Sequence, residues 1–161
     1  MTEVADGDRI IANGGSMERQ DVRENKIDGN ETADARVPMD EALFLRIKAA
    51  FEKRGGIIES GDNIDRHLDS MGAEAATFDE STIIIKRGIP TASTLFEELI
   101  HTAQYRKGIV STENKDVLEL EAKRKLVRNQ KAYKIPDHEN EETLRQIAIL
   151  ENRLINGQER D

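Results

Sequence analysis

The sequence contains no cysteine and no tryptophan, and it has only three prolines among its 161 residues. Without cysteine the chain can form no disulfide, no thiolate metal site and no thiol nucleophile. No apolar run is long enough to cross a bilayer, and the polar first residues lack the apolar core of a signal peptide. We therefore expect no membrane span and no recognisable N-terminal signal peptide.

Histidine and aromatic residues are also scarce. His67, His101 and His138 are the only histidines, and aromatic residues make up 4% of the chain. Because imidazole and thiolate are the usual protein ligands of zinc, any metal site here must rely on carboxylates. Hydrophobic residues make up 37% of the chain, which is enough for one modest core and suggests a single domain.

Charge is distributed unevenly along the chain. The net charge is −8, but residues 102–134 contain nine Lys and Arg against four Asp and Glu, a balance of +5 that leaves −13 for the remainder. A globally acidic chain is a poor nucleic-acid binder, although a local basic face can be an exception. The simplest interpretation of the basic segment is a solvated helix face.

Two parts of different composition are visible. Residues 1–38 are rich in Asp, Glu, Gly, Asn and Arg, with turn signals such as Asn13-Gly14 and little apolar periodicity. This composition predicts a flexible or disordered N-terminal lead. Residues 39–157 carry the apolar periodicity of a folded domain, which opens with Asp40 as a helix N-cap after Pro38.

Within the domain, the periodicity predicts more helix than strand. A short strand is expected at Ile57-Ile58 and a hairpin over 74–87. Because the strands look adjacent and antiparallel, the predicted class is α+β, mainly helical with a small antiparallel hairpin or sheet. The expected helices are 40–54, 62–70, 92–107, 115–131 and 139–156. The expected buried face of helix 92–107 consists of Phe96, Leu99, Ile100 and Ala103, and that of helix 139–156 consists of Leu144, Ile147, Ala148 and Leu154.

The most informative stretch is Glu97-Glu98-Leu99-Ile100-His101, which differs by one residue from the zinc-peptidase motif His-Glu-x-x-His. In that motif two histidines one helical turn apart bind the metal, and the glutamate after the first acts as general base. Glu98 and His101 occupy the base and second-ligand positions, and they are the candidate catalytic residues. Glu97 stands in the first-ligand position. Because Glu97 and His101 are four residues apart, a helix places both on one face.

The stretch Phe-Glu-Glu-Leu-Ile-His-Thr-Ala-Gln-Tyr-Arg, followed by Glu-x-Glu-Ala, resembles the zincin-like metallopeptidase domains at the C-termini of bacterial polymorphic toxins. The resemblance implies metal ligands at Glu97, His101 and Glu121, with Glu98 as the base. In peptidases whose third ligand is a glutamate, that residue comes from the next helix, and Glu119 is the second choice for it here.

The resemblance also implies a biological setting. Toxin domains of this kind act in interbacterial competition and are secreted or delivered into the cytoplasm of a target cell. A bacterial toxin or effector with a hydrolytic, peptidase-like site would act on a protein substrate, and a dedicated immunity protein is the expected partner.

The chain departs from the family at Glu97, where a histidine is expected. A ligand set of two carboxylates and one imidazole is harder and more anionic than His-His-Glu. It suits a divalent transition metal such as Mn²⁺ or Fe²⁺, or a more weakly bound Zn²⁺. A competing explanation is a capping box, in which Thr94 caps the helix and Glu97 reaches back to the Thr94 N–H rather than toward a metal.

Two further functions remain open from the sequence. The first is a metal-independent ribonuclease toxin, with Glu98 and His101 in acid–base roles and Arg106, Lys123, Arg124 and Arg128 as its cationic surface. The second is a catalytically inactive, zincin-like module that binds a partner protein. RNA is therefore an alternative to protein as the substrate.

Overall fold

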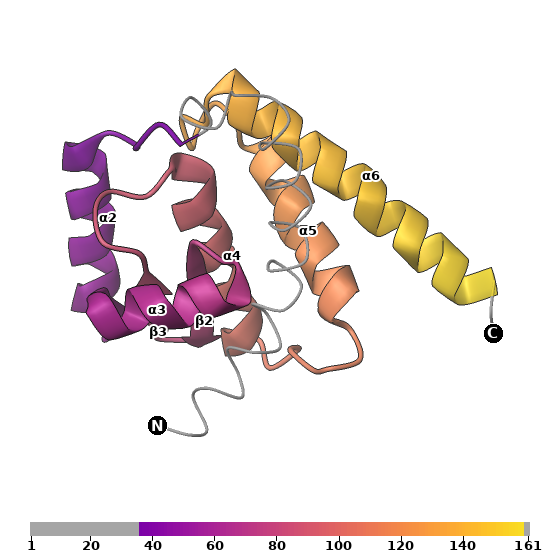
Figure 1. Cartoon of the computed structure of the whole chain (residues 1–161), viewed down its shortest axis with the longest axis horizontal. Coiled ribbons are helices and arrows are strands. Elements are labelled where there is room, and N and C mark those ends of the chain that lie inside the picture. The colour runs from indigo at the N-terminus through magenta and orange to yellow at the C-terminus, as the bar shows by residue number, and fades with distance from the viewer. Residues whose placement is uncertain (1–35, 160–161) are drawn as a thin grey trace.

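A computed structural model describes residues 36–159 (Figure 1). Within this range the chain is α+β and mainly helical, which confirms the predicted class. The elements are α2 (Glu41–Lys53), β1 (Ile57–Glu59), α3 (Asp62–Met71), β2 (Ala75–Asp79), β3 (Thr82–Ile85), α4 (Ala92–Arg106), α5 (Lys115–Arg128) and α6 (Asp137–Glu159). Most of the expected N-terminal lead, residues 1–35, lies outside the described residues, so that interpretation stays a prediction.

The three strands form one mixed sheet in the order β1-β3-β2. β2 and β3 pair antiparallel, which confirms the predicted hairpin, and β1 pairs with β3 in parallel. The expectation of antiparallel strands throughout is therefore wrong for β1. The chain reverses direction between β1 and β2, which α3 connects, and again in the turn between β2 and β3. β1 and β3 therefore run in the same direction.

The sheet divides the apolar core into two parts. Ile83 and Ile85 of β3 belong to the larger cluster, which contains Leu95 of α4 and Phe51 of α2. Ile84, which lies between them, belongs to a smaller cluster under α3. This alternation follows from the two-residue period of a strand, and burying each such side chain contributes about 1.5–3 kcal/mol. The arrangement fixes α4 against one face of the sheet.

The start of α4 is capped from two directions. The hydroxyl of Thr91, the N-cap residue, accepts a hydrogen bond from the Thr94 N–H at 3.2 Å. The buried carboxylate of Glu139, on α6, accepts from the Ser93 N–H at 3.1 Å. An anionic group at a helix N-terminus also interacts favourably with the helix dipole. These contacts tie α4 to the beginning of α6.

α5 and α6 form a helical hairpin beside α4, and α6 extends along α5 away from the sheet (Figure 1). Among the described side chains of α6, those of Leu150, Thr143 and Glu139 are buried. The expected inner face is therefore wrong at Leu144, which is 47% exposed, and at Ala148, which is exposed. Since α6 packs chiefly on one neighbour, its buried stripe is narrow and part of its apolar surface stays in solvent.

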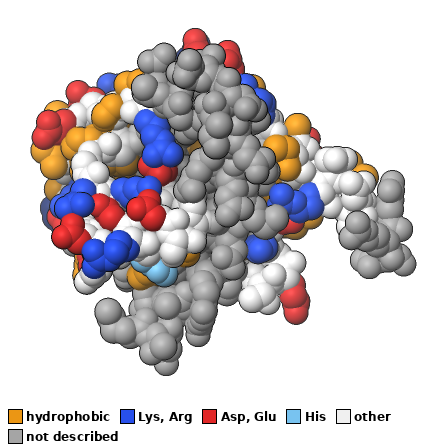
Figure 2. All heavy atoms as spheres, viewed as in Figure 1, with side chains coloured by type: hydrophobic (Ala, Val, Ile, Leu, Met, Phe, Trp, Pro, Cys, Tyr) orange, Lys and Arg blue, Asp and Glu red, His pale blue; other side chains and the backbone are white. Residues whose placement is uncertain are grey.

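Charged side chains of both signs mix on the face that Figure 2 shows around α3. Arg87 contacts Asp65 at 2.7 Å, and Lys86 contacts Glu74 at 3.2 Å. Among the helices of residues 36–159, none combines the length and the apolar character needed to cross a membrane.

Candidate metal centre

The buried face of α4 is largely polar, which the sequence interpretation did not anticipate. Of the four residues expected on that face only Ile100 is buried, whereas Phe96, Leu99 and Ala103 are half-buried. The buried polar side chains of α4 are Thr94, Glu97, Glu98, His101, Thr102 and Gln104. The reason is that α4 lies between the sheet and α5, so its carboxylate-bearing side is covered by protein rather than by water.

The capping-box explanation of Glu97 is wrong. Thr91, not Thr94, is the N-cap residue of α4, so Thr94 lies in its first turn and Glu97 lies a further turn inside. Glu97 is only 8% exposed and extends toward α5. A buried carboxylate requires partners. Transferring a charged carboxylate from water into the protein interior without a hydrogen-bonding or charged partner costs several kcal/mol. Its position therefore has to be explained by the groups that surround it.

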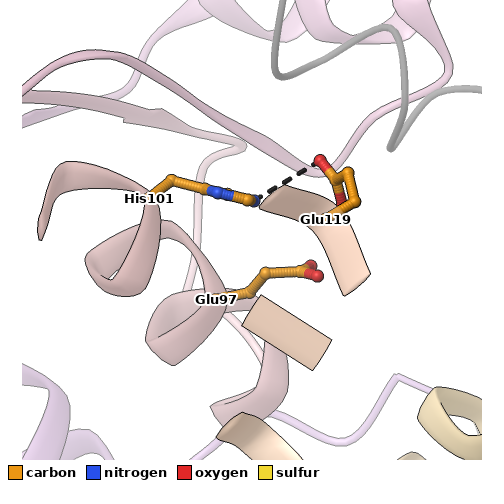
Figure 3. A group of neighbouring side chains, drawn as sticks. All are labelled: Glu97, His101 and Glu119. Atoms are coloured by element: carbon orange, nitrogen blue, oxygen red, sulfur yellow. Dashed lines mark ion pairs between the residues drawn. The ribbon is translucent and has the colours of Figure 1, made fainter. Parts of the chain in front are cut away.

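Glu97, His101 and Glu119 converge between α4 and α5 (Figure 3). Their ligand atoms all lie within 4.8 Å of one another. His101 Nε2 is 3.4 Å from Glu119 Oε1, and both side chains are almost completely buried. The structure thus brings together the two predicted ligands of α4 with one carboxylate of the next helix.

Glu119, the second choice for third ligand, completes this group, and Glu121 lies elsewhere. Glu121 is exposed and accepts a hydrogen bond from Gln104 Nε2 at 2.9 Å. Residues two apart on a helix point roughly 200° away from each other, so only one of the two carboxylates can face His101. The side chain of Glu119, which is 2% exposed, occupies that position.

Gln104 holds the ring of His101 in place. His101 Nδ1 lies 2.8 Å from Gln104 Oε1, and the Gln104 amide donates to the Leu118 carbonyl at 3.0 Å as well as to Glu121. Because Nδ1 is hydrogen-bonded to the amide oxygen of Gln104, the other ring nitrogen, Nε2, is directed at Glu119. Metal-binding histidines are commonly oriented by this type of contact on the other ring nitrogen.

Two opposing effects act on the pKa of His101. Burial alone lowers it, because an apolar environment disfavours the imidazolium. The charge and hydrogen bond of Glu119, with smaller contributions from Glu98 and Glu97, outweigh burial and raise the pKa of His101 to about 10. In the metal-free protein the ring is therefore protonated at neutral pH, and metal binding must release that proton.

Glu98 faces the sheet beside the group rather than within it. Its Oε1 atom accepts a hydrogen bond from Thr77 Oγ1 of β2 at 2.8 Å. Burial raises the pKa of Glu98 to about 7, although the charge of His101 and the Thr77 hydroxyl pull it down. A carboxylate that titrates near neutral pH is well matched to accept a proton during catalysis.

Lys123 of α5 is part of the cluster, although the sequence interpretation assigned it to a cationic surface. Its Nζ atom is 2.6 Å from Glu97 Oε2 and 3.9 Å from Glu119 Oε2, and the side chain is buried. Its spacing in the sequence could have indicated this position. Lys123 follows Glu119 by four residues, so the two side chains lie on the same face of the helix and are buried together. Together with protonated His101, Lys123 balances the two carboxylates.

The donor set fits a divalent metal. Two carboxylate oxygens and one imidazole nitrogen suit Mn²⁺, Fe²⁺ or Zn²⁺. In a tetrahedral zinc site with bonds of about 2.0–2.2 Å, the ligand atoms lie about 3.3–3.6 Å from each other. The ligand atoms of Glu97, His101 and Glu119 lie within 4.8 Å of one another, so side-chain movements of about 1 Å would bring them to that separation. A buried Glu-His-Glu group could therefore hold a metal ion.

The sequence matches no protein-family model, and comparisons with curated proteins and with solved structures give no significant match either.

Proposed function

We propose that this chain is a metal-assisted hydrolase of the zincin-like type, with Glu97, His101 and Glu119 holding a divalent transition metal. The observation that supports this most is the convergence of the ligand atoms of these three side chains within 4.8 Å of one another. Glu98 is near enough for the charges of His101 and Glu97 to act on its pKa. Zinc, manganese and iron are all compatible with the donors. The resemblance to polymorphic-toxin peptidases leads us to propose further a bacterial toxin or effector that acts on protein in a target cell and is restrained by an immunity protein.

Each residue then has a defined task. The metal, when bound, supplies Lewis acidity for the hydrolysis of an amide or ester bond. Glu98 takes the proton of the attacking water, for which a pKa near 7 is suited. Gln104 keeps Nε2 of His101 directed at the centre, and Thr77 holds the carboxylate of Glu98 in a fixed position. These residues lie on α4, α5 and β2 rather than on loops, which holds the set rigidly.

A second candidate is a catalytically inactive module of the same shape. The observation that favours it is the Lys123 ammonium, which lies 2.6 Å from Glu97 and, together with protonated His101, balances the cluster without a metal. A buried, charge-balanced network can serve to fix helix packing alone. In that case the function lies in a surface that binds a partner protein.

The ribonuclease alternative gains less support. Of the basic residues expected on its cationic surface, Lys123 is buried in the carboxylate cluster and Arg124 is paired with Glu151 at 2.5 Å. Lys123 is not placed to contact RNA phosphates without leaving Glu97, and the charge of Arg124 is partly balanced by Glu151. Arg106 and Arg128 are exposed and remain available.

Activity assays with a matched pair of variants test the proposal. Protein loaded with Zn²⁺ or Mn²⁺ is incubated with a quenched-fluorescence peptide library and, separately, with total RNA. Glu98→Gln should retain the metal and lose roughly 100-fold or more of peptide cleavage, whereas Glu113→Gln, in the loop after α4, should behave as wild type. Metal binding without peptide cleavage would favour the inactive module. RNA cleavage that persists in a chelator and disappears in Glu98→Gln would favour the ribonuclease.

A further inference from the structure

The Lys123 ammonium contacts a carboxylate that the proposed metal would need. Its ammonium nitrogen is 2.6 Å from one ligand carboxylate, that of Glu97, and 3.9 Å from the other, that of Glu119. Glu97 lies on α4 and Glu119 on α5. The contacts of Lys123 therefore include an ion pair between two helices in addition to the pairing with Glu119 along α5. With only 3% of the residue exposed, water cannot screen the interaction.

A divalent metal and this ammonium are incompatible at such separations. Both need the carboxylate of Glu97, and two cations held within a few ångströms in a buried site repel each other strongly. Lysine has a flexible four-carbon stem and a compact charge, so its head group can move while its backbone stays in α5. Moving it leaves Glu97 and Glu119 free to approach a single ion.

We propose that the Lys123 ammonium is an internal cation that alternates with the divalent metal between Glu97 and Glu119 and must leave Glu97 before the metal enters. This inference rests on the proposed metal site. In the metal-free protein Lys123 compensates the buried carboxylates and keeps α4 and α5 together. Its displacement sets the metal affinity, so the site fills only when the metal is abundant enough to displace it.

Metal titration of full-length variants tests the inference. Lys123→Gln removes the charge and keeps a polar group, while Lys125→Gln makes the same change on the same helix outside the cluster. With Zn²⁺ and Mn²⁺ as probes in calorimetry, Lys123→Gln should bind at least about tenfold tighter than wild type, the effect of about 1.4 kcal/mol. Lys125→Gln should bind as wild type does. Without metal, Lys123→Gln should melt at a lower temperature and recover on metal addition.

The outcomes separate the two proposals. If wild type binds metal and Lys123→Gln binds it equally or more weakly, the proposed role of Lys123 is wrong, whereas the proposed metal site is unaffected. Absence of binding in both proteins removes the metal site and this inference with it.

A measurement on the wild-type chain guards against a variant that fails to fold. Amine acetylation followed by mass spectrometry should leave Lys123 protected in metal-free protein and modify it once Zn²⁺ is saturating, with Lys125 modified equally in both. Continued protection of Lys123 at saturating metal would contradict the exchange.

Discussion

The Nδ1 atom of His101 lies 2.8 Å from the side-chain oxygen of Gln104, one turn further along the same helix. The Gln104 amide is held in turn by the Leu118 carbonyl of α5. This chain of contacts determines which nitrogen of His101 faces Glu119. It also links the orientation of a candidate ligand to the packing of α4 against α5.

Replacing Gln104 by leucine should weaken metal binding by about 10–100-fold, because the ring of His101 loses its orienting partner. Gln104→Glu keeps an acceptor for Nδ1–H but loses the bonds donated to the Leu118 carbonyl and to Glu121, and it places two carboxylates together. It should therefore restore only part of the affinity. Calorimetric titration with Zn²⁺ measures both, and Gln146→Leu on α6 serves as the control. Wild-type affinity in a folded Gln104→Leu protein would show that the contact does not position a ligand.

Removing the hydroxyl of Thr77 should raise the pKa of Glu98 further above about 7. The hydrogen bond from Thr77 favours the carboxylate form, and Thr77→Val abolishes it at a cost in stability of about 1 kcal/mol. A ¹³C NMR titration of the Glu98 carboxyl carbon, assigned with Glu98→Gln, measures the change. Thr102→Val, also buried in α4 but bonded to the Leu99 carbonyl, should leave that midpoint unchanged. A midpoint that falls in Thr77→Val would refute the assigned role.

The metal-free protein should lose stability as pH rises from about 7 to about 9. The pKa of His101 is raised from 6.5 to about 10, so over that window the folded state binds more protons than the unfolded state. The stabilisation is complete below pH 6.5 and is lost as pH rises through about 10. Urea unfolding with chelator present measures the slope. His101→Gln should flatten it, whereas His138→Gln, at the exposed start of α6, should not.

Much of the fold follows from local sequence signals. The five helices of residues 36–159, the hairpin and the Asp40 cap correspond to periodicity and capping residues. The Asp40 carboxylate accepts a hydrogen bond from the Leu43 N–H at 2.9 Å. The direction of β1 could not be obtained in this way, because it depends on the path of the chain through α3. Tertiary arrangement decides such features, and short-range patterns do not encode it.

For a similar reason, the sequence could predict only some residues of the candidate metal site. The spacing of Glu97 and His101 gives two members of the group from one helix. The choice of Glu119 over Glu121 depends on the rotation of α5, and that rotation also carries Lys123 inward. Apolar periodicity misled the prediction for α4, since its stripe through Leu99 is less buried than its carboxylates. A buried polar face is visible only after the neighbouring helix is in place.

The central claim is that Glu97, His101 and Glu119 bind one metal ion, and anomalous diffraction from crystals grown with Zn²⁺ or Mn²⁺ tests it most directly. The account predicts one strong anomalous peak about 2.0–2.2 Å from a carboxylate oxygen of each glutamate and from His101 Nε2, with Lys123 withdrawn from Glu97. A saturated crystal with no peak there, and with Lys123 still bonded to Glu97, would contradict it.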